Sequence, residues 1–180
     1  MKLTTAASIT IAKPRTEVFD FCTKNDTFER LLRPLGPIAG IAKAEFRESQ
    51  TLRTGARRSI TMTDGTVLEE KILDYAPPTR HQYRWEEGVK PPFSWLVRSG
   101  TGCWDFSEVQ DGGGTRVDWS YVFELRSTLA YPLALPIVPL FRRWLQRGLD
   151  AIASEMEHKD AATPPPEITH RPSGQSARSH

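Results

Sequence analysis

The sequence of 180 residues suits a single domain, and its 24 Lys and Arg nearly balance its 22 Asp and Glu, leaving a formal net charge of +2. A chain without a basic stripe is not expected to bind nucleic acid, and two cysteines are too few for the disulfide framework of a small secreted domain. Because no stretch reaches the about 20 apolar residues of a membrane span and polar residues interrupt the N-terminus, we expect a cytoplasmic protein.

The N-terminal part predicts one strand and two short helices. Residues 6–12 alternate between small polar and β-branched side chains, which is typical of a strand. Pro14 followed by Glu17 suits the first turn of a helix, because proline needs no amide partner there and an acid complements the positive end. A second helical turn is expected over residues 28–32, ended by Pro34.

Six strands are then expected in close succession, over residues 41–48, 57–63, 67–75, 81–86, 95–109 and 115–125. The last is the clearest, because apolar residues at every second position from Val117 to Leu125 alternate with mostly polar ones. Asp64-Gly65 predicts a tight hairpin between two of the strands. Gly100 and Gly102 predict bends or a bulge within the strand 95–109.

One long amphipathic helix is expected over residues 138–159, with a wide apolar stripe on one side. Gly148 on this helix predicts a point of close backbone approach. We therefore expect an α+β fold in which a curved antiparallel sheet of about seven strands wraps on the long C-terminal helix. The domain is expected to span residues 1–160. Residues 161–180, rich in Pro, Ser, Arg and His, are expected to form a disordered tail.

Several short motifs follow one another at places that a family resemblance explains: ITIAKP at 9–14, EVFDF at 17–21, DGTVLEEKI at 64–72, YAPP at 75–78 and GTRV leading into WSY at 114–121. Over about residues 6–158 the chain resembles the START-like or SRPBCC superfamily, in its polyketide cyclase/dehydrase and lipid transport branch. The resemblance implies a helix-grip fold with a largely apolar cavity between sheet and helix. It also implies roles such as lipid or ubiquinone binding, polyketide cyclisation or hormone sensing.

Motifs for metals and cofactors are missing from the sequence. The four histidines show no paired spacing and neither cysteine has a CxxC partner, so three or four metal ligands cannot be assembled from the pattern. The sequence has no nucleophile elbow, phosphate loop or dinucleotide fingerprint. We expect neither a metal nor a cofactor.

Aromatic side chains on the inward faces of the strands have two interpretations. They are either ordinary core packing or the wall of a cavity, since pockets are mostly apolar and aromatic. The abundance of Trp and Tyr favours a wall, because both carry a polar group that needs a partner when buried. The residues expected to contact a ligand, together with the apolar side of the helix, are Trp85, Trp104, Phe106, Trp119, Tyr121, Phe123, Phe141, Leu145, Leu149 and Ile152.

Three polar residues are candidates for chemistry inside such a cavity: Arg58, Glu70 and Tyr83. Glu70 is in phase with Leu68 and Ile72, and an unmatched inward carboxylate could act as an acid or base. The alternative places Arg58 and Glu70 on the outer face as a cross-strand ion pair. His81, at a strand start just after two prolines, is expected on the surface.

Residues 129–147 form the other unusual stretch, apolar at first and then arginine-rich around Trp144. Arg142 and Arg143 near a helix N-terminus oppose the helix dipole. The stretch either docks on an anionic surface such as lipid head groups, or is a solvated face with local pairs such as Arg147 with Asp150.

These features support three functions, in decreasing order. The first is binding of a small hydrophobic ligand (lipid, polyketide or aromatic) in the cavity. The second is a cyclase or dehydratase that uses polar cavity residues for proton transfer. The third is a membrane-peripheral lipid or quinone chaperone that contacts the bilayer through residues 129–147.

Overall fold

The structure is a computed structural model that describes residues 1–47, 51–110 and 113–161. The tail expected at 161–180 lies outside these residues except for Ala161, and Glu48 of the first hairpin lies outside them too. The elements, in chain order, are β1 (Lys2–Ile11), α1 (Arg15–Thr23), α2 (Asn25–Leu31), β2 (Ile41–Phe46), β3 (Arg57–Met62), β4 (Val67–Ala76), β5 (Arg80–Glu87), α3 (Phe93–Leu96), β6 (Val97–Glu108), β7 (Thr115–Leu125), α4 (Ala130–Ala134) and α5 (Ile137–Ala161).

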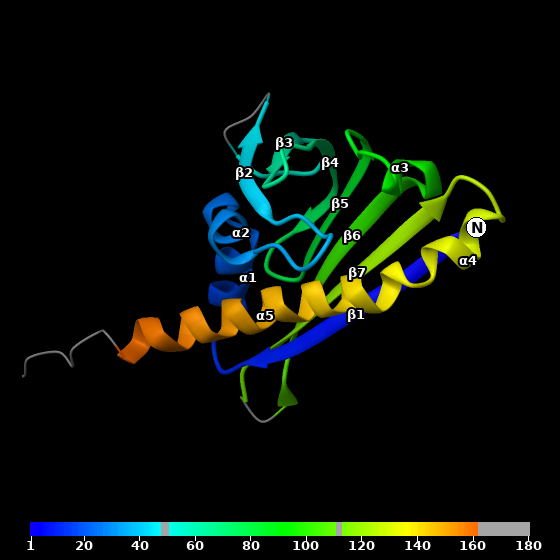
Figure 1. Ribbon diagram of the computed structural model, residues 1–180. Helices are drawn as coiled ribbons and strands as arrows, with labels where there is room; N and C mark the ends of the chain where they lie inside the picture. Colours follow the sequence, from blue (N-terminus) through cyan, green and yellow to red (C-terminus); the bar gives the residue numbers. More distant parts are fainter. Residues whose placement is uncertain (48–50, 111–112, 162–180) are drawn as a thin grey trace, which may run out of the picture.

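Seven strands form one antiparallel sheet in the order β1-β7-β6-β5-β4-β3-β2. Strands β2 to β7 follow each other as a meander, and β1 pairs with β7. The sheet curves around α5, which runs along it beside β1 (Figure 1). The expected α+β helix-grip fold is confirmed.

The pattern of β7 explains how the sheet and helix meet. Burial alternates along the strand, so that Trp119, Tyr121 and Phe123 are buried while their neighbours are only partly covered. The helix α5 contributes the matching stripe, with Leu145 and Leu149 fully buried. Burying one such side chain contributes about 1.5 to 3 kcal/mol, so packing rather than helix propensity holds α5 in place.

The middle of α5 lies unusually close to its neighbours. A Cβ atom added to Gly148 would lie 2.5 Å from Leu32 Cδ2 and 3.3 Å from Trp119 Cζ3. The expected close approach at Gly148 is therefore confirmed. Nearby, Trp144 Nε1 donates a hydrogen bond to the carbonyl of Arg33 at 2.9 Å, which joins α5 to the segment after α2.

Two short helices were not predicted from the sequence. The helix α3 occupies the start of the strand expected at 95–109, so β6 begins at Val97, and α4 precedes α5. The irregular pairing of β6 with β7 lies between Val97 and Ser99. Gly100 and Gly102 come after it, so they do not mark the bulge that was predicted at their positions.

Within the described ranges, no helix combines the length and the apolar character that crossing a membrane requires. The same residues contain no cluster of three or more His, Cys, Asp or Glu side chains that could hold a metal ion.

Candidate functional site

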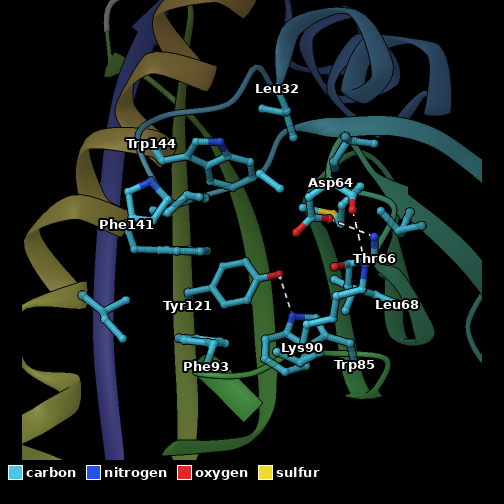
Figure 2. A pocket seen from close by; sticks show the side chains of 18 of the residues that line it. Leu32, Asp64, Thr66, Leu68, Trp85, Lys90, Phe93, Tyr121, Phe141 and Trp144 are labelled. Carbon is cyan, nitrogen blue, oxygen red and sulfur yellow. Dashed lines mark hydrogen bonds between the residues drawn. The ribbon is translucent and has the colours of Figure 1, made fainter. Parts of the chain in front are cut away.

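A cavity of about 390 Å³ lies between the inner face of the sheet and the N-terminal part of α5. Its walls come from β3, β4, β5, β7 and α5, and two loop segments, residues 37–39 and 89–92, contribute to it. Figure 2 shows Phe141, Trp144 and Tyr121 on one side, facing Leu68 and Thr66 across the space. Most of the lining side chains are apolar, which is the character of a site for a small organic molecule.

Four buried aromatic side chains on β5 and β7 form one wall: Tyr83, Trp85, Trp119 and Tyr121. Trp119 Nε1 donates a hydrogen bond to the Tyr83 hydroxyl at 3.2 Å, and Trp85 Nε1 donates one to the Tyr121 hydroxyl at 3.3 Å (Figure 2 shows the second). Because each hydroxyl oxygen already accepts a bond from an indole, its own proton is free to be donated in another direction.

Two glycines of β6 make room for this wall. Tyr83 pairs with Gly102 and Trp85 pairs with Gly100 across β5 and β6. A Cβ on Gly102 would lie 2.5 Å from Tyr83 Cζ, and one on Gly100 would lie 2.4 Å from Trp85 Cζ2. The two rings therefore lie down on bare backbone, where any larger residue would push them away from the sheet.

An ion pair between β3 and β4 supplies the charged groups of the cavity. Arg58 donates to Glu70 Oε2 from Nη2 at 2.7 Å and from Nε at 3.1 Å, and its Nη1 donates to Asn25 Oδ1 at 3.1 Å. The two side chains are only 2% and 7% exposed. The Arg58 guanidinium also lies 5.1 Å from the ring centre of Phe28 and 5.7 Å from that of Tyr83, a cation–π arrangement.

Glu70 keeps one carboxylate oxygen for another partner. Both bonds from Arg58 go to Oε2, and no described residue donates a hydrogen bond to Oε1. Since Glu70 lines the cavity, Oε1 is an acceptor offered to whatever occupies that space. The ion pair as a whole is neutral, so this part of the cavity suits an uncharged group that donates a hydrogen bond.

Burial keeps both tyrosines of the wall protonated. It raises the pKa of Tyr83 to about 12, with the Glu70 carboxylate adding to the effect. Burial likewise raises the pKa of Tyr121 well above its usual value, helped by Tyr83 and Glu70. At neutral pH both hydroxyls are hydrogen-bond donors and not bases.

The expected site residues separate into two groups. Those that line the cavity are Arg58, Glu70, Tyr83, Trp85, Trp119, Tyr121 and Phe141. The other expected ligand contacts lie in the packed core behind this lining: Trp104, Phe106, Phe123, Leu145, Leu149 and Ile152. Trp104, for example, stacks on Trp119 with ring centres 4.1 Å apart, so Trp119 stands between it and the cavity.

Two expectations about polar residues are wrong. The alternative that placed Arg58 and Glu70 on the outer face fails because both side chains are buried on the inner face. His81, expected on the surface, has no exposed area. It lies on the same face as Tyr83 and packs between the rings of Tyr75 and Tyr83, with centres 5.8 and 5.4 Å away.

The buried imidazole of His81 predicts a specific dependence of stability on pH. Burial, and then the charge of Arg58, lower its pKa from 6.5 to about 3, so the folded protein excludes a proton that the unfolded chain binds. The free energy of unfolding should therefore fall by about 1.4 kcal/mol per pH unit as the pH drops below 6.5, and the loss should continue toward pH 3. Urea denaturation of the wild type and of His81→Phe at several pH values measures this. Parallel pH profiles for the two proteins would contradict it.

Two loops supply lining residues that the strand and helix patterns did not single out. Ile38 follows α2, while Val89 and Phe93 belong to the segment between β5 and β6. Lys90 Nζ donates to the Asp64 carbonyl at 3.3 Å, which joins this segment to the β3–β4 turn (Figure 2). The available signal was the presence of isolated apolar residues in loops otherwise rich in Pro and Gly.

Solved structures with the same architecture come from distant proteins. One from Nitrosospira multiformis is 20% identical with a TM-score of 0.64, covering 88% of this chain and 99% of its own. Ara h 8.0201 is 14% identical with a TM-score of 0.61 and the same coverage, 88% and 99%. Major latex-like protein 151 from Panax ginseng is 13% identical with a TM-score of 0.60, covering 86% and 97%. At such identities the likeness shows the fold alone.

Sequence comparison is more direct. No curated protein sequence matches the chain at a significant level. The model of the family described as polyketide cyclase / dehydrase and lipid transport matches residues 2–157. Because this match spans nearly the whole described domain and the fold agrees with it, the chain belongs to the polyketide cyclase / dehydrase and lipid transport family.

Proposed function

We propose that the protein binds one small, uncharged and mainly apolar molecule in the cavity between the sheet and α5. The observation that carries this proposal is an aromatic cavity of about 390 Å³ that contains a neutral ion pair. This volume is near the lower end of the range of about 300 to 1,000 Å³ for small-molecule sites, so it suits a single compact ligand. The family's description, which names lipid transport, is in keeping with an apolar ligand.

The polar groups of the cavity define how such a ligand would be oriented. Glu70 Oε1 accepts a hydrogen bond from a hydroxyl or N–H group of the ligand, and the Tyr83 and Tyr121 hydroxyls donate to a ligand oxygen. Both ends of the ligand are then matched without a net charge. A charged ligand would have to lose its water without a free counter-ion, which is costly.

A neutral fluorescent probe with one N–H group, N-phenyl-1-naphthylamine, tests this arrangement. We expect the wild type to bind it. Glu70→Gln should bind it about tenfold or more weakly, because a hydrogen bond to a charged group contributes about 1.5 to 3 kcal/mol. The N-methylated probe lacks the donor and should be insensitive to the substitution. The readout is the rise in probe fluorescence on titration.

A pair of tryptophan substitutions on β4 serves as the steric control. Leu68→Trp fills the cavity and should abolish probe binding, whereas Leu73→Trp on the same strand is exposed and should not. Native mass spectrometry of the purified protein identifies any ligand carried along. Probe binding that survives Leu68→Trp would contradict the proposed site.

A cyclase or dehydratase is the second candidate function, favoured by the convergence of Arg58, Glu70 and Tyr83 on one cavity. The cavity would fold a polyketide-like or aromatic substrate, Glu70 would accept a proton, and Tyr83 would donate to an oxygen that gains charge. Binding ranks first because Glu70 is held in an ion pair and Tyr83 is a donor only. Loss of water from a linear polyketone incubated with the protein would favour the second function.

A further inference from the structure

An exposed apolar patch lies at the end of the molecule where α3 and α4 meet. Trp95 on α3 is 70% exposed, and Leu129 and Leu133 at α4 are 82% and 66% exposed. We call these three residues the insertion patch. The two helices contact each other, and Figure 1 shows them beside the N-terminus, away from α1 and α2. Singly exposed apolar residues are ordinary, but a large indole and two leucines together on adjoining helices are not.

The patch is built on a fixed support. The Arg126 amide donates to the Leu96 carbonyl at 2.9 Å, and Arg126 Nε donates to the Ser94 carbonyl at 2.6 Å. These bonds join the end of α3 to the segment that leads into α4. The exposed side chains are therefore held together by ordered backbone.

The charges around the patch all have one sign. Neither residues 88–104 nor residues 125–149 contain an Asp or Glu. The same two stretches carry six cations, which are Lys90, Arg98, Arg126, Arg142, Arg143 and Arg147, and all six are exposed. The acids of α5, such as Asp150 and Glu155, begin only afterwards. An apolar patch bordered by cations alone is complementary to an anionic surface with an apolar interior.

The same segments also line the ligand cavity. Phe93 and Leu96 of α3 face the cavity while Trp95 faces outward, and Ile137 and Leu140 line it just after α4. The patch and the cavity thus use opposite sides of one short stretch of chain. A molecule that enters or leaves beside α3 would pass next to whatever covers the patch.

We propose that the insertion patch docks the protein on an anionic lipid bilayer, with Trp95, Leu129 and Leu133 among the acyl chains and the arginines at the head groups. A bilayer fits better than a protein partner because it supplies both an apolar interior and diffuse negative charge. In one respect this inference rests on the proposed function, since an apolar ligand is held in membranes and needs a route from them. It also explains Arg142 and Arg143, which oppose the dipole of α5 but would contact lipid phosphates.

Vesicle flotation tests the docking. Wild-type protein should float with vesicles of phosphatidylglycerol and phosphatidylcholine, and not with phosphatidylcholine alone. Trp95→Ser with Leu129→Ser and Leu133→Ser should reduce the bound fraction at least about tenfold. The matched control, Val67→Ser with Leu73→Ser, removes exposed apolar side chains from β4 and should bind like the wild type. Raising the salt from about 0.1 M to about 1 M, which shortens the Debye length from about 10 Å to about 3 Å, should also reduce binding.

Fluorescence quenching reports on insertion itself. The other four tryptophans are at most 6% exposed, so brominated lipid should quench mainly Trp95. Replacing it by Phe should remove that quenching but keep flotation. For the charges, Arg142→Gln with Arg143→Gln should weaken binding more than Arg53→Gln with Arg57→Gln, an equal change of net charge on exposed residues elsewhere.

The outcomes separate this proposal from the proposed function. Vesicle binding that is absent, or unchanged in the triple variant, overturns docking. So does light scattering in which the patch residues hold a dimer while vesicles do not bind. Probe binding is measured on the same variants. If flotation behaves as expected while the probe never binds, the proposed function fails and the docking surface stands.

Discussion

Replacing Arg58 by Met is expected to lower the free energy of unfolding by about 3 to 5 kcal/mol, because it leaves the buried carboxylate of Glu70 without a cation. Arg58 makes both hydrogen bonds to Glu70 and a third to Asn25, and its side chain is 2% exposed. A surface ion pair would contribute at most about 1 kcal/mol. The size of the loss in urea denaturation therefore distinguishes a buried pair from a surface one.

The double variant separates the pair from the charge it leaves behind. Arg58→Met with Glu70→Leu removes both charges and replaces them by apolar groups, which is often neutral or stabilising. We expect it to recover most of the stability that Arg58→Met loses, while still lacking the acceptor for a ligand N–H group. A double variant no more stable than Arg58→Met would show that the two residues act independently, and the ion pair would then have no structural role.

This ion pair shows what the sequence could predict of the site. The Asp64-Gly65 turn sets the register of β3 against β4, and in that register Arg58 stands opposite Glu70. Alternation then places both on one face with Ile60 and Ile72. What alternation cannot tell is which face of a strand lies inward when charged and apolar residues share it, so the outer-face alternative stayed open until burial was known.

Depth was the second limit. Trp104 and Trp119 are indistinguishable by pattern, since each lies on the inner side of a long strand with period two. Only the stacking of one on the other decides that Trp119 lines the cavity and Trp104 does not. The helix α3 was missed for a related reason: its Phe93 and Trp95 have side chains typical of strands, and tertiary contacts decided their conformation.

Gly102→Ala is expected to destabilise the protein by about 1 to 3 kcal/mol, although alanine is the better residue in an ordinary strand. Removing a glycine usually gains about 0.5 to 1 kcal/mol, since the unfolded chain loses freedom. Here the new methyl would lie 2.5 Å from Tyr83 Cζ, and the ring would have to move. The clash exceeds the gain because Tyr83 is held by Trp119 and is 4% exposed.

The displaced ring has one direction available, away from the sheet and into the cavity, so Gly102→Ala should weaken probe binding as well as stability. Gly113→Ala is the matched control, because its methyl would meet Val109 Cγ1 at an ordinary 3.6 Å. In a Tyr83→Leu background the clash disappears, and Gly102→Ala should become neutral or stabilising. A double-mutant cycle measures this coupling. If the cost of Gly102→Ala were the same in both backgrounds, the glycine would not be the support on which the aromatic wall of the cavity rests.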